Sequence, residues 1–156
     1  MNKSNFKIVL YSPEIPGNTG SIGRTCVALN AELILIHPLG FDIDEKAVRR
    51  AGLDYWKHVK ITEYQNFQEF LDSEKPQLET LHFFTKNAKK NLFETSFKED
   101  CYLVFGCETK GLPQEVLSKY QDELVSLPIL SENIRSLNLA SVATTAAYEA
   151  IRQIKY

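Results

Sequence analysis

The sequence predicts an α/β fold in which a parallel sheet is covered on both faces by helices. Short β-rich segments alternate with segments of helical periodicity along the whole chain of 156 residues. Two strand segments, 32–37 (ELILIH) and 101–107 (CYLVFGC), are almost wholly apolar, which is typical of strands buried on both faces of a parallel sheet. The length, and the lack of any repeat or linker-like segment, predict a single domain over residues 1–156.

The first half of the chain predicts three strands and three helices. A strand over 6–11 ends at Ser12, and the loop after it leads into a helix that Asn18 and Thr19 are placed to cap. The apolar segment 32–37 is the second strand. The other predicted elements are a helix through 47–50 that Asp42 or Asp44 caps and Gly52 ends, a strand over 59–62 and a helix over 67–71.

The second half predicts strands over 79–85, 101–107 and 124–127, with a helix through 116–120. Asn138 is a good N-cap for the last helix, because its side-chain oxygen can accept an amide hydrogen of the first turn. A second stripe of this helix carries Thr144, Tyr148 and Arg152, so Tyr148 and the polar loop before the helix could belong to one site. The first stripe consists of mostly small apolar residues that let another backbone come close: Leu139, Ala143, Ala146, Ala147, Ala150 and Ile154.

Composition narrows the function classes. The net charge of −2 gives no general attraction for nucleic acid, so RNA contact requires a local basic patch or a dimer that combines two patches. No apolar run approaches the roughly 20 residues that cross a bilayer, and the N-terminus does not resemble a signal peptide, so no membrane partner is expected. Cys26, Cys101 and Cys107 form no CxxC pair, and the three histidines lack metal-ligand spacing. We therefore expect no disulfide, no metal and a cytoplasmic location.

Three polar segments follow predicted strands, and in open α/β sheets ligands bind at the carboxyl ends of strands. Residues 18–24 (NTGSIGR) open a helix that could hold a phosphate with Arg24 as a forked donor, although a capped helix with a solvated arginine explains the segment equally well. Residues 104–113 (VFGCETKGLP) place Glu108 where it could accept backbone amides or pair with Arg24. The loop over 127–138 is crowded with amide, hydroxyl and guanidinium groups, and an ordinary polar loop is its plain alternative.

A fourth segment, 49–57 (RRAGLDYWK), interleaves basic residues with Tyr55 and Trp56. Phosphate pairing and base stacking with RNA would use such residues, but a basic helix end and aromatic side chains packed in the core explain them as well. Lys86, Lys89 and Lys90 form a second basic patch. Such a patch is more often an ordinary solvated surface than an RNA-binding site.

The segments NTGSIGR, VFGCETKGLP and LP…IRSLNLASVA…YE together resemble the three motifs of the SPOUT superfamily of RNA methyltransferases. The most similar branch is that of the small TrmL/YibK-like tRNA 2′-O-methyltransferases. The resemblance spans essentially the whole chain, including IHPLGF and RRAGLDYW. Cys107 and Ala140 depart from the residues common in relatives, and both changes are conservative in size.

The resemblance implies a fold, a cofactor and an assembly. The fold is the SPOUT fold, a parallel sheet flanked by helices with a deep C-terminal trefoil knot. The knot is expected to bind S-adenosylmethionine, with S-adenosylhomocysteine as product, and enzymes of this family work as homodimers. The implied cofactor contacts are Phe84, Gly106, Leu127 and Ser136. The implied reaction-centre residues, in which Glu108 and Asn18 orient Arg24, are Arg24, Asn18, Glu108, Ser136, Asn138 and Tyr148.

The implied reaction is methylation of the ribose 2′-oxygen of the wobble nucleotide, cytidine or uridine 34, in leucine tRNAs. The implied RNA partner is the anticodon stem-loop, gripped by two copies of the region around Arg49, Arg50 and Lys57. A SPOUT 2′-O-methyltransferase for another tRNA position or for ribosomal RNA remains an alternative, as does an RNA-binding module or knotted scaffold without catalysis. A Rossmann nucleotide enzyme is disfavoured, because the first strand–helix turn carries no GxGxxG.

Overall fold

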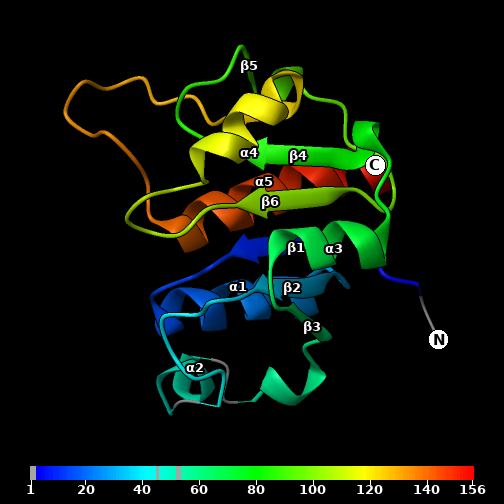
Figure 1. Ribbon diagram of the computed structural model, residues 1–156, viewed down its shortest axis with the longest axis vertical. Helices are drawn as coiled ribbons and strands as arrows, with labels where there is room; N and C mark the ends of the chain where they lie inside the picture. Colours follow the sequence, from blue (N-terminus) through cyan, green and yellow to red (C-terminus); the bar gives the residue numbers. More distant parts are fainter. Residues whose placement is uncertain (1–2, 45, 52–53) are drawn as a thin grey trace.

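The computed structural model describes residues 3–44, 46–51 and 54–156, and it contains a seven-stranded sheet with the order β3-β2-β1-β6-β4-β7-β5 (Figure 1). Every pairing between neighbouring strands of this sheet is parallel, which confirms the predicted fold class. The strands are β1 (Lys7–Tyr11), β2 (Glu32–Ile36), β3 (Ile61–Tyr64), β4 (Leu81–Phe84), β5 (Lys90–Asn91), β6 (Tyr102–Phe105) and β7 (Leu124–Ser126).

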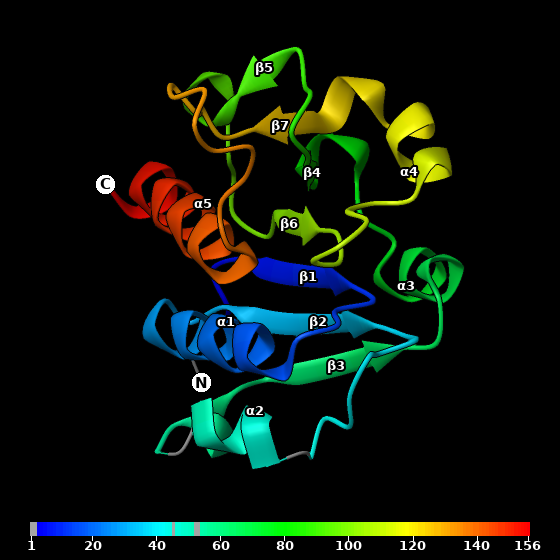
Figure 2. The same cartoon turned by 90° about the vertical axis from the view of Figure 1, so that its left-hand side faces the viewer.

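Helices cover both faces of the sheet. Helices α1 and α5 lie on one face, and α3 and α4 lie on the other (Figure 2). Within the described ranges, none of these helices is long and apolar enough to cross a membrane. The helices are α1 (Pro16–Ala28), α2 (Lys46–Ala51), α3 (Phe67–Glu74), α4 (Gln114–Lys119) and α5 (Leu139–Lys155), and the short 3₁₀ turns are η1 (Trp56–His58), η2 (Leu78–Thr80), η3 (Leu92–Glu94) and η4 (Gln121–Glu123).

The sheet separates two hydrophobic clusters, because successive side chains of a strand point to opposite faces. In β1, Ile8 and Leu10 belong to the cluster under α1 and α5, while Val9 between them belongs to the cluster on the other face. Phe70 of α3 is fully buried in this second cluster. Strands with both faces buried have to be apolar throughout, which is the pattern that the sequence shows in β2 and β6.

The close contact between α1 and α5 depends on small side chains. Ala143, Ala146, Ala147 and Ala150 are fully buried, which confirms the predicted apolar stripe of the last helix. The hydroxyl oxygens of Thr25 in α1 and Thr144 in α5 lie 2.7 Å apart and share a hydrogen bond across this contact. The two helices therefore pack as one layer whose N-terminal ends are held at the same edge of the sheet (Figure 2).

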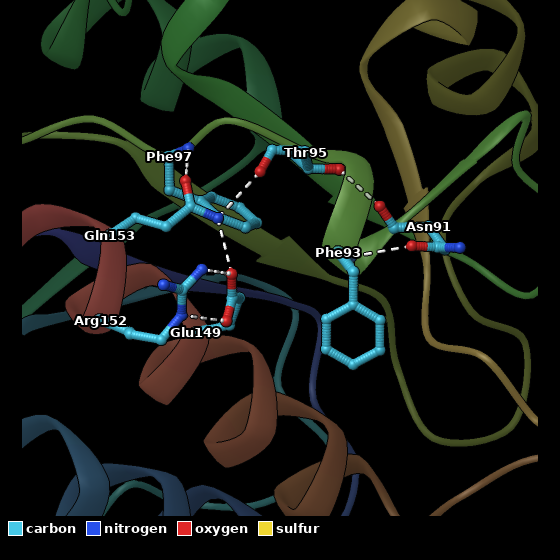
Figure 3. A network of polar contacts seen from close by, with 7 residues as sticks. All are labelled: Asn91, Phe93, Thr95, Phe97, Glu149, Arg152 and Gln153. Atoms are coloured by element: carbon cyan, nitrogen blue, oxygen red, sulfur yellow. Dashed lines mark hydrogen bonds and ion pairs between the residues drawn. The ribbon is translucent and has the colours of Figure 1, made fainter.

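The C-terminal half of α5 is tied to the chain between β5 and β6 (Figure 3). The side chain of Gln153 accepts a hydrogen bond from Phe97 N at 2.8 Å and donates to Thr95 O at 3.0 Å. Its amide nitrogen also donates to Glu149 Oε2 at 2.7 Å, and Glu149 forms a bidentate pair with Arg152. These contacts fix the C-terminal end of α5 and so help to set the position of its N-terminal end at the carboxyl edge of the sheet.

Some predicted element boundaries are wrong. Helix α1 begins at Pro16 with Ile15 as its N-cap, so Asn18 and Thr19 lie inside the first turn instead of capping it. Proline is favoured at this place because its fixed φ suits a helix and its missing N–H leaves no donor unpaired. The two-residue strand β5 was not predicted, since its segment reads only as basic and polar. The predicted helix stop at Gly52 lies outside the described residues, as does Leu53 of the segment 49–57.

The turn after β6 requires a glycine for a steric reason. A Cβ atom on Gly106 would lie 2.1 Å from the carbonyl carbon of Gly111 and 2.2 Å from Leu112 N. Cys107 and Gly111 form an antiparallel bridge that folds this turn back on itself, and Gly111 has a φ of 68°. The two glycines therefore permit a tight turn in which the backbone packs against the end of its own strand.

We expect Gly106→Ala to lower the free energy of unfolding by about 1 to 3 kcal/mol or more, because the added methyl group collides with the backbone of Gly111 and Leu112. Gly17→Ala is the matched control: it lies in α1 with no atom within 4 Å of the added Cβ, so we expect a change of at most about 0.5 to 1 kcal/mol, in the stabilising direction. Urea unfolding followed by circular dichroism measures both. Equal unfolding free energies for the two variants would contradict this steric explanation.

Candidate functional site

A cavity of about 600 Å³ opens at the carboxyl edge of the sheet. The chain after β1, β4, β6 and β7 supplies its walls, together with the first turn of α5, so the loops predicted to carry the site surround this cavity. Its lining residues are Ile15, Asn18, Phe84, Thr85, Lys86, Asn87, Phe105, Gly106, Cys107, Glu108, Thr109, Lys110, Gly111, Leu112, Leu117, Val125, Leu127, Ile129, Ser136, Leu137, Asn138, Leu139 and Val142.

The floor of the cavity is apolar and its rim is polar. Phe84 and Phe105 stack at the ends of β4 and β6, with ring centroids 4.7 Å apart and planes inclined by 18°. Leu127 at the end of β7 adds an aliphatic surface beside them. Backbone groups at glycine turns and the side chains of Ser136 and Asn138 provide hydrogen-bonding groups around this floor. Such a cavity suits a ligand with a flat ring and a polar tail.

Glu108 links two of the cavity walls. Its Oε1 accepts a hydrogen bond from Glu14 N at 2.8 Å, and its Oε2 accepts from Ile15 N at 2.9 Å. Oε2 also accepts from Asn18 Nδ2 at 3.2 Å. The predicted interpretation that Glu108 accepts backbone amides is therefore confirmed. The carboxylate satisfies amides at the start of α1, where unpaired N–H groups favour a negative charge.

Asn18 continues the connection from Glu108 to the last helix. Its Oδ1 accepts a hydrogen bond from Asn138 Nδ2 at 3.2 Å. Asn138 in turn caps α5, since its Oδ1 accepts from Ala140 N at 2.9 Å and from Ser141 N at 3.3 Å. This confirms the predicted N-cap. The chain Glu108–Asn18–Asn138 thus joins the turn after β6 and the starts of α1 and α5 in one hydrogen-bonded network beside the cavity.

Seven of the nine predicted site residues line the cavity: Asn18, Phe84, Gly106, Glu108, Leu127, Ser136 and Asn138. Arg24 and Tyr148 do not belong to this lining. Tyr148 is 53% exposed on α5, and Arg24 is exposed on α1. These two side chains are therefore exposed on α1 and α5, and neither contributes to the lining of this cavity.

The environment of Arg24 differs from the predicted one. Its guanidinium carbon lies 5.0 Å from the centre of the Tyr55 ring, which is a cation–π contact. Across the described ranges, no hydrogen bond joins Arg24 to Glu108 or Asn18 of the same chain, and the orientation of Arg24 by these two residues stays a prediction. The oxygens of Glu108 instead accept hydrogen bonds from the backbone amides of Glu14 and Ile15.

The aromatic side chains of the fourth polar segment have a packing role. A Cβ atom on Gly23 would lie 2.7 Å from Cζ3 of Trp56, so the indole ring occupies the space that this glycine leaves on α1. Trp56 therefore packs against α1, and its side chain stays partly exposed to solvent. Arg50 and Lys57 have exposed side chains, whereas the side chain of Arg49 lies outside the described part of the chain.

Sequence reasoning missed several residues of the cavity. Ile15 and Asn87 line it without belonging to any motif, and Lys110 lies in the motif 104–113 but was given no role there. Their only sequence signal is position, because each lies within a few residues of a strand end at the carboxyl edge.

The three cysteines lie in different surroundings. Burial raises the pKa of Cys26 and Cys101 to about 12, so these two thiols stay protonated at neutral pH. Cys107 lies in the cavity wall.

Comparison with known proteins places the chain in a family. The SpoU rRNA Methylase family model matches residues 5–148. A protein of Saccharophagus degradans named "tRNA (cytidine(34)-2'-O)-methyltransferase" is 43% identical over 152 residues, which cover 97% of this chain and 97% of that protein.

Two solved structures extend the comparison. One, from a study of "2-OH methylation of C/U34 on tRNA", is 41% identical, has a TM-score of 0.88 and covers 95% of each chain. The other is the SpoU methyltransferase AviRb from Streptomyces viridochromogenes in complex with AdoMet, which is 26% identical with a TM-score of 0.84 and covers 97% of this chain and 62% of that one. The chain belongs to the SpoU rRNA Methylase family, and its resemblance to the SPOUT methyltransferases is confirmed.

Proposed function

We propose that this protein is a tRNA (cytidine/uridine(34)-2′-O)-methyltransferase that uses S-adenosylmethionine. The observation that carries the proposal is the convergence of Glu108, Asn18 and Asn138 in one network beside a 600 Å³ cavity at the carboxyl edge of the sheet. Support comes from the activity in the name of the Saccharophagus degradans relative and from the C/U34 methylation with which the 41% identical structure is concerned.

The residues of the cavity fit S-adenosylmethionine. A volume of about 600 Å³ lies within the range of roughly 300–1,000 Å³ typical of small-molecule sites. The stacked rings of Phe84 and Phe105, with Leu127, would hold the adenine, and the backbone at Gly106 with the hydroxyl of Ser136 would hold its polar groups. AdoMet bound to the related AviRb supports the assignment. When bound, the cofactor supplies a methyl group that its positively charged sulfur already activates.

The residues of this chain would then align the acceptor and stabilise charge. Asn18 and Asn138 present amide groups at the rim of the cavity, where they would orient the ribose oxygen. A guanidinium has a pKa above about 12 and stays charged. Arg24 would therefore position a phosphate and stabilise the alkoxide that develops on the 2′-oxygen, and a phosphate oxygen or water would take the proton. The product left in the cavity would be S-adenosylhomocysteine.

We also propose that the enzyme is a homodimer in which Arg24 acts on the cavity of the other subunit. Arg24 and Tyr148 are exposed on adjacent helices, α1 and α5, and neither lines the cavity of its own chain. An arginine that serves the reaction from this position needs a second cavity brought to it. Two-fold symmetry supplies one, because each subunit then presents its helical layer to the other. Tyr148 would lie in or beside this interface.

The knot and the location of the protein are further parts of the proposal. Strand β7 lies between β4 and β5, whereas α5, which follows it, packs against α1 and β6. The chain over 127–138 therefore has to return across the sheet edge, which supports the expected deep trefoil knot in this segment. A cytoplasmic location accords with a tRNA substrate and with free thiols at Cys26, Cys101 and Cys107. The proposed reaction requires neither a metal nor a membrane.

The first prediction concerns the substrate. Incubation of the protein with methyl-tritiated S-adenosylmethionine and total tRNA should place the label on the 2′-oxygen of nucleotide 34 in leucine tRNAs. Nuclease digestion and nucleoside mapping identify the labelled position. Label at another tRNA position, or in ribosomal RNA only, would instead establish the alternative substrate within the same family. No label in any RNA would contradict a methyltransferase function altogether.

The second prediction separates the two possible positions of Arg24. Arg24→Ala and Asn18→Ala should each lower kcat/KM at least about 100-fold, because each removes a polar group at the reaction centre. In a dimer with Arg24 acting across the interface, mixing the two variants leaves one cavity of each mixed dimer with both side chains intact. About a quarter of the wild-type activity should then return when half of the dimers are mixed.

The control for this experiment is the Arg24→Ala protein alone, whose dimers are dissociated and allowed to reassociate. This sample should remain inactive. If the mixed dimers also remain inactive, Arg24 serves the cavity of its own subunit and the proposed arrangement is wrong. If Arg24→Ala alone keeps normal activity, the residue has no part in methyl transfer.

The third prediction concerns RNA binding. Affinity for the anticodon stem-loop should fall steeply as salt rises, because lysine and arginine release counterions from phosphates. Lys57→Ala should reduce the slope of log affinity against log salt by about one for each phosphate contact removed. Lys98→Ala, in the segment before β6, is the control and should leave the slope unchanged. Fluorescence anisotropy gives the slopes, and an affinity that does not change with salt would exclude this basic surface.

A further inference from the structure

Two glutamates connect the loop after β1 with the turn after β6 in both directions. Glu108 accepts hydrogen bonds from Glu14 N at 2.8 Å and Ile15 N at 2.9 Å. In the opposite direction, Glu14 Oε1 accepts from Thr109 N at 3.0 Å and from Thr109 Oγ1 at 2.7 Å. Each loop thus receives the carboxylate of the other. We call this arrangement, formed by Glu14, Glu108 and Thr109, the carboxylate clasp.

The loop that carries Glu14 is also held from its other side. Gly40, in the loop after β2, donates a hydrogen bond from its N–H to Pro13 O at 2.9 Å. A Cβ atom on Gly40 would lie 2.9 Å from Glu14 Cα, so the two backbones are in direct contact. The loop after β1 is therefore enclosed between the loop after β2 and the turn after β6, and the clasp is the side-chain part of this enclosure.

The clasp lies next to the groups proposed to meet the substrate. Thr109 and Glu108 line the cavity. Asn18 lies four residues after Glu14 in the sequence, and its Nδ2 donates a hydrogen bond to Glu108 Oε2 at 3.2 Å. Glu14 itself is not part of the cavity lining. Its effect on the site would pass through the two loops that it joins.

We propose that Glu14 is a positioning residue for methyl transfer, which holds Asn18 in place relative to the cavity wall formed by residues 106–112. This inference rests on the proposed function. The wall has its own support from the Gly106 contact with Gly111 and Leu112, whereas the hydrogen bonds described between the loop after β1 and this wall are those made by the side chains of Glu14 and Glu108. Loss of Glu14 should therefore displace Asn18 more than the cofactor surface. Misplacement of a reacting group by about 1 Å can lower a rate about 100-fold.

The electrostatics of the clasp agree with this role. The backbone amide of Thr109 lowers the pKa of Glu14 most, followed by the Thr109 hydroxyl and the Cys107 side chain, while Lys110 contributes less. The carboxylate is therefore ionised at neutral pH and binds its donors as charge-assisted acceptors. Because the folded pKa is lowered, the clasp is fully formed above the ordinary pKa of a glutamate, and its contribution is lost as the pH falls through the lowered value.

The test compares Glu14→Ala with Glu14→Gln and with the control Glu79→Ala, which removes an exposed carboxylate on η2 outside the cavity lining. We expect Glu14→Ala to lower kcat about 10- to 100-fold and to change the Kd for S-adenosylmethionine less than about threefold. Glu14→Gln should restore much of kcat, since its amide oxygen can still accept from Thr109. Glu79→Ala should leave kcat and Kd unchanged.

Thr109→Val provides a second variant, which removes the hydroxyl and keeps the backbone amide. It should lower kcat less than Glu14→Ala, and the double variant should be no slower than Glu14→Ala alone, because both substitutions break the same contact. Unchanged kcat in Glu14→Ala would overturn the proposal. So would a Glu14→Gln variant as slow as Glu14→Ala, since that result would assign the effect to charge alone.

Hydrogen–deuterium exchange gives a readout that needs no activity. Amides of residues 12–18 should exchange at least several-fold faster in Glu14→Ala than in the wild type, while the urea concentration at the midpoint of global unfolding stays unchanged. Unchanged exchange would overturn the clasp as a constraint on this loop. If the wild-type protein transfers no methyl group to any RNA, the proposed function fails, and the exchange result still decides whether Glu14 fixes the loop.

Discussion

The carboxylate of Glu108 accepts hydrogen bonds from Glu14 N, Ile15 N and Asn18 Nδ2, groups that lie 90 to 94 residues earlier in the chain. Amides at the start of a helix have no partner within the helix, and burial without a partner is costly. One acidic residue satisfies them and thereby fixes where α1 begins relative to the turn after β6. The position of Asn18, and through it the contact with the cap of α5, follows from this constraint.

Parallel strands make this constraint possible. Because β1 and β6 are neighbours in register, with Leu10 beside Phe105, the loops that leave their carboxyl ends start side by side. Close packing of the turn against Gly106 then leaves no room for alternative courses of the chain. Buried alanines such as Ala143 and Ala147 bring α5 against α1, so that its capped end reaches the same edge. The core thus determines the geometry of the cavity before any ligand binds.

The sequence was sufficient where the cause of a structure is local, and insufficient where it is not. Apolar strands, the Asn138 cap and the small-residue stripe of α5 each depend on neighbours within a few residues, and each was predicted. The start of α1 was predicted wrongly, because the groups that occupy Asn18 come from Glu108 and Asn138, which no local pattern reveals. A solvated Arg24 was one of the two alternatives that the sequence left open, whereas its contact with Tyr55 was missed, since it depends on how Tyr55 packs beside α1.

The distribution of charge around the cavity bears on the assembly. The network that joins the walls contains one carboxylate and two amides, and the cations of the lining, Lys86 and Lys110, come from the loops after β4 and β6. The guanidinium that the reaction would use stands instead on the exposed surface of α1, next to α5. A site that must stabilise negative charge on a ribose oxygen would be short of a donor on the α1 side if the monomer worked alone. In the proposed homodimer, the same surface of the second subunit would supply that donor, which would account for the exposed position of Arg24.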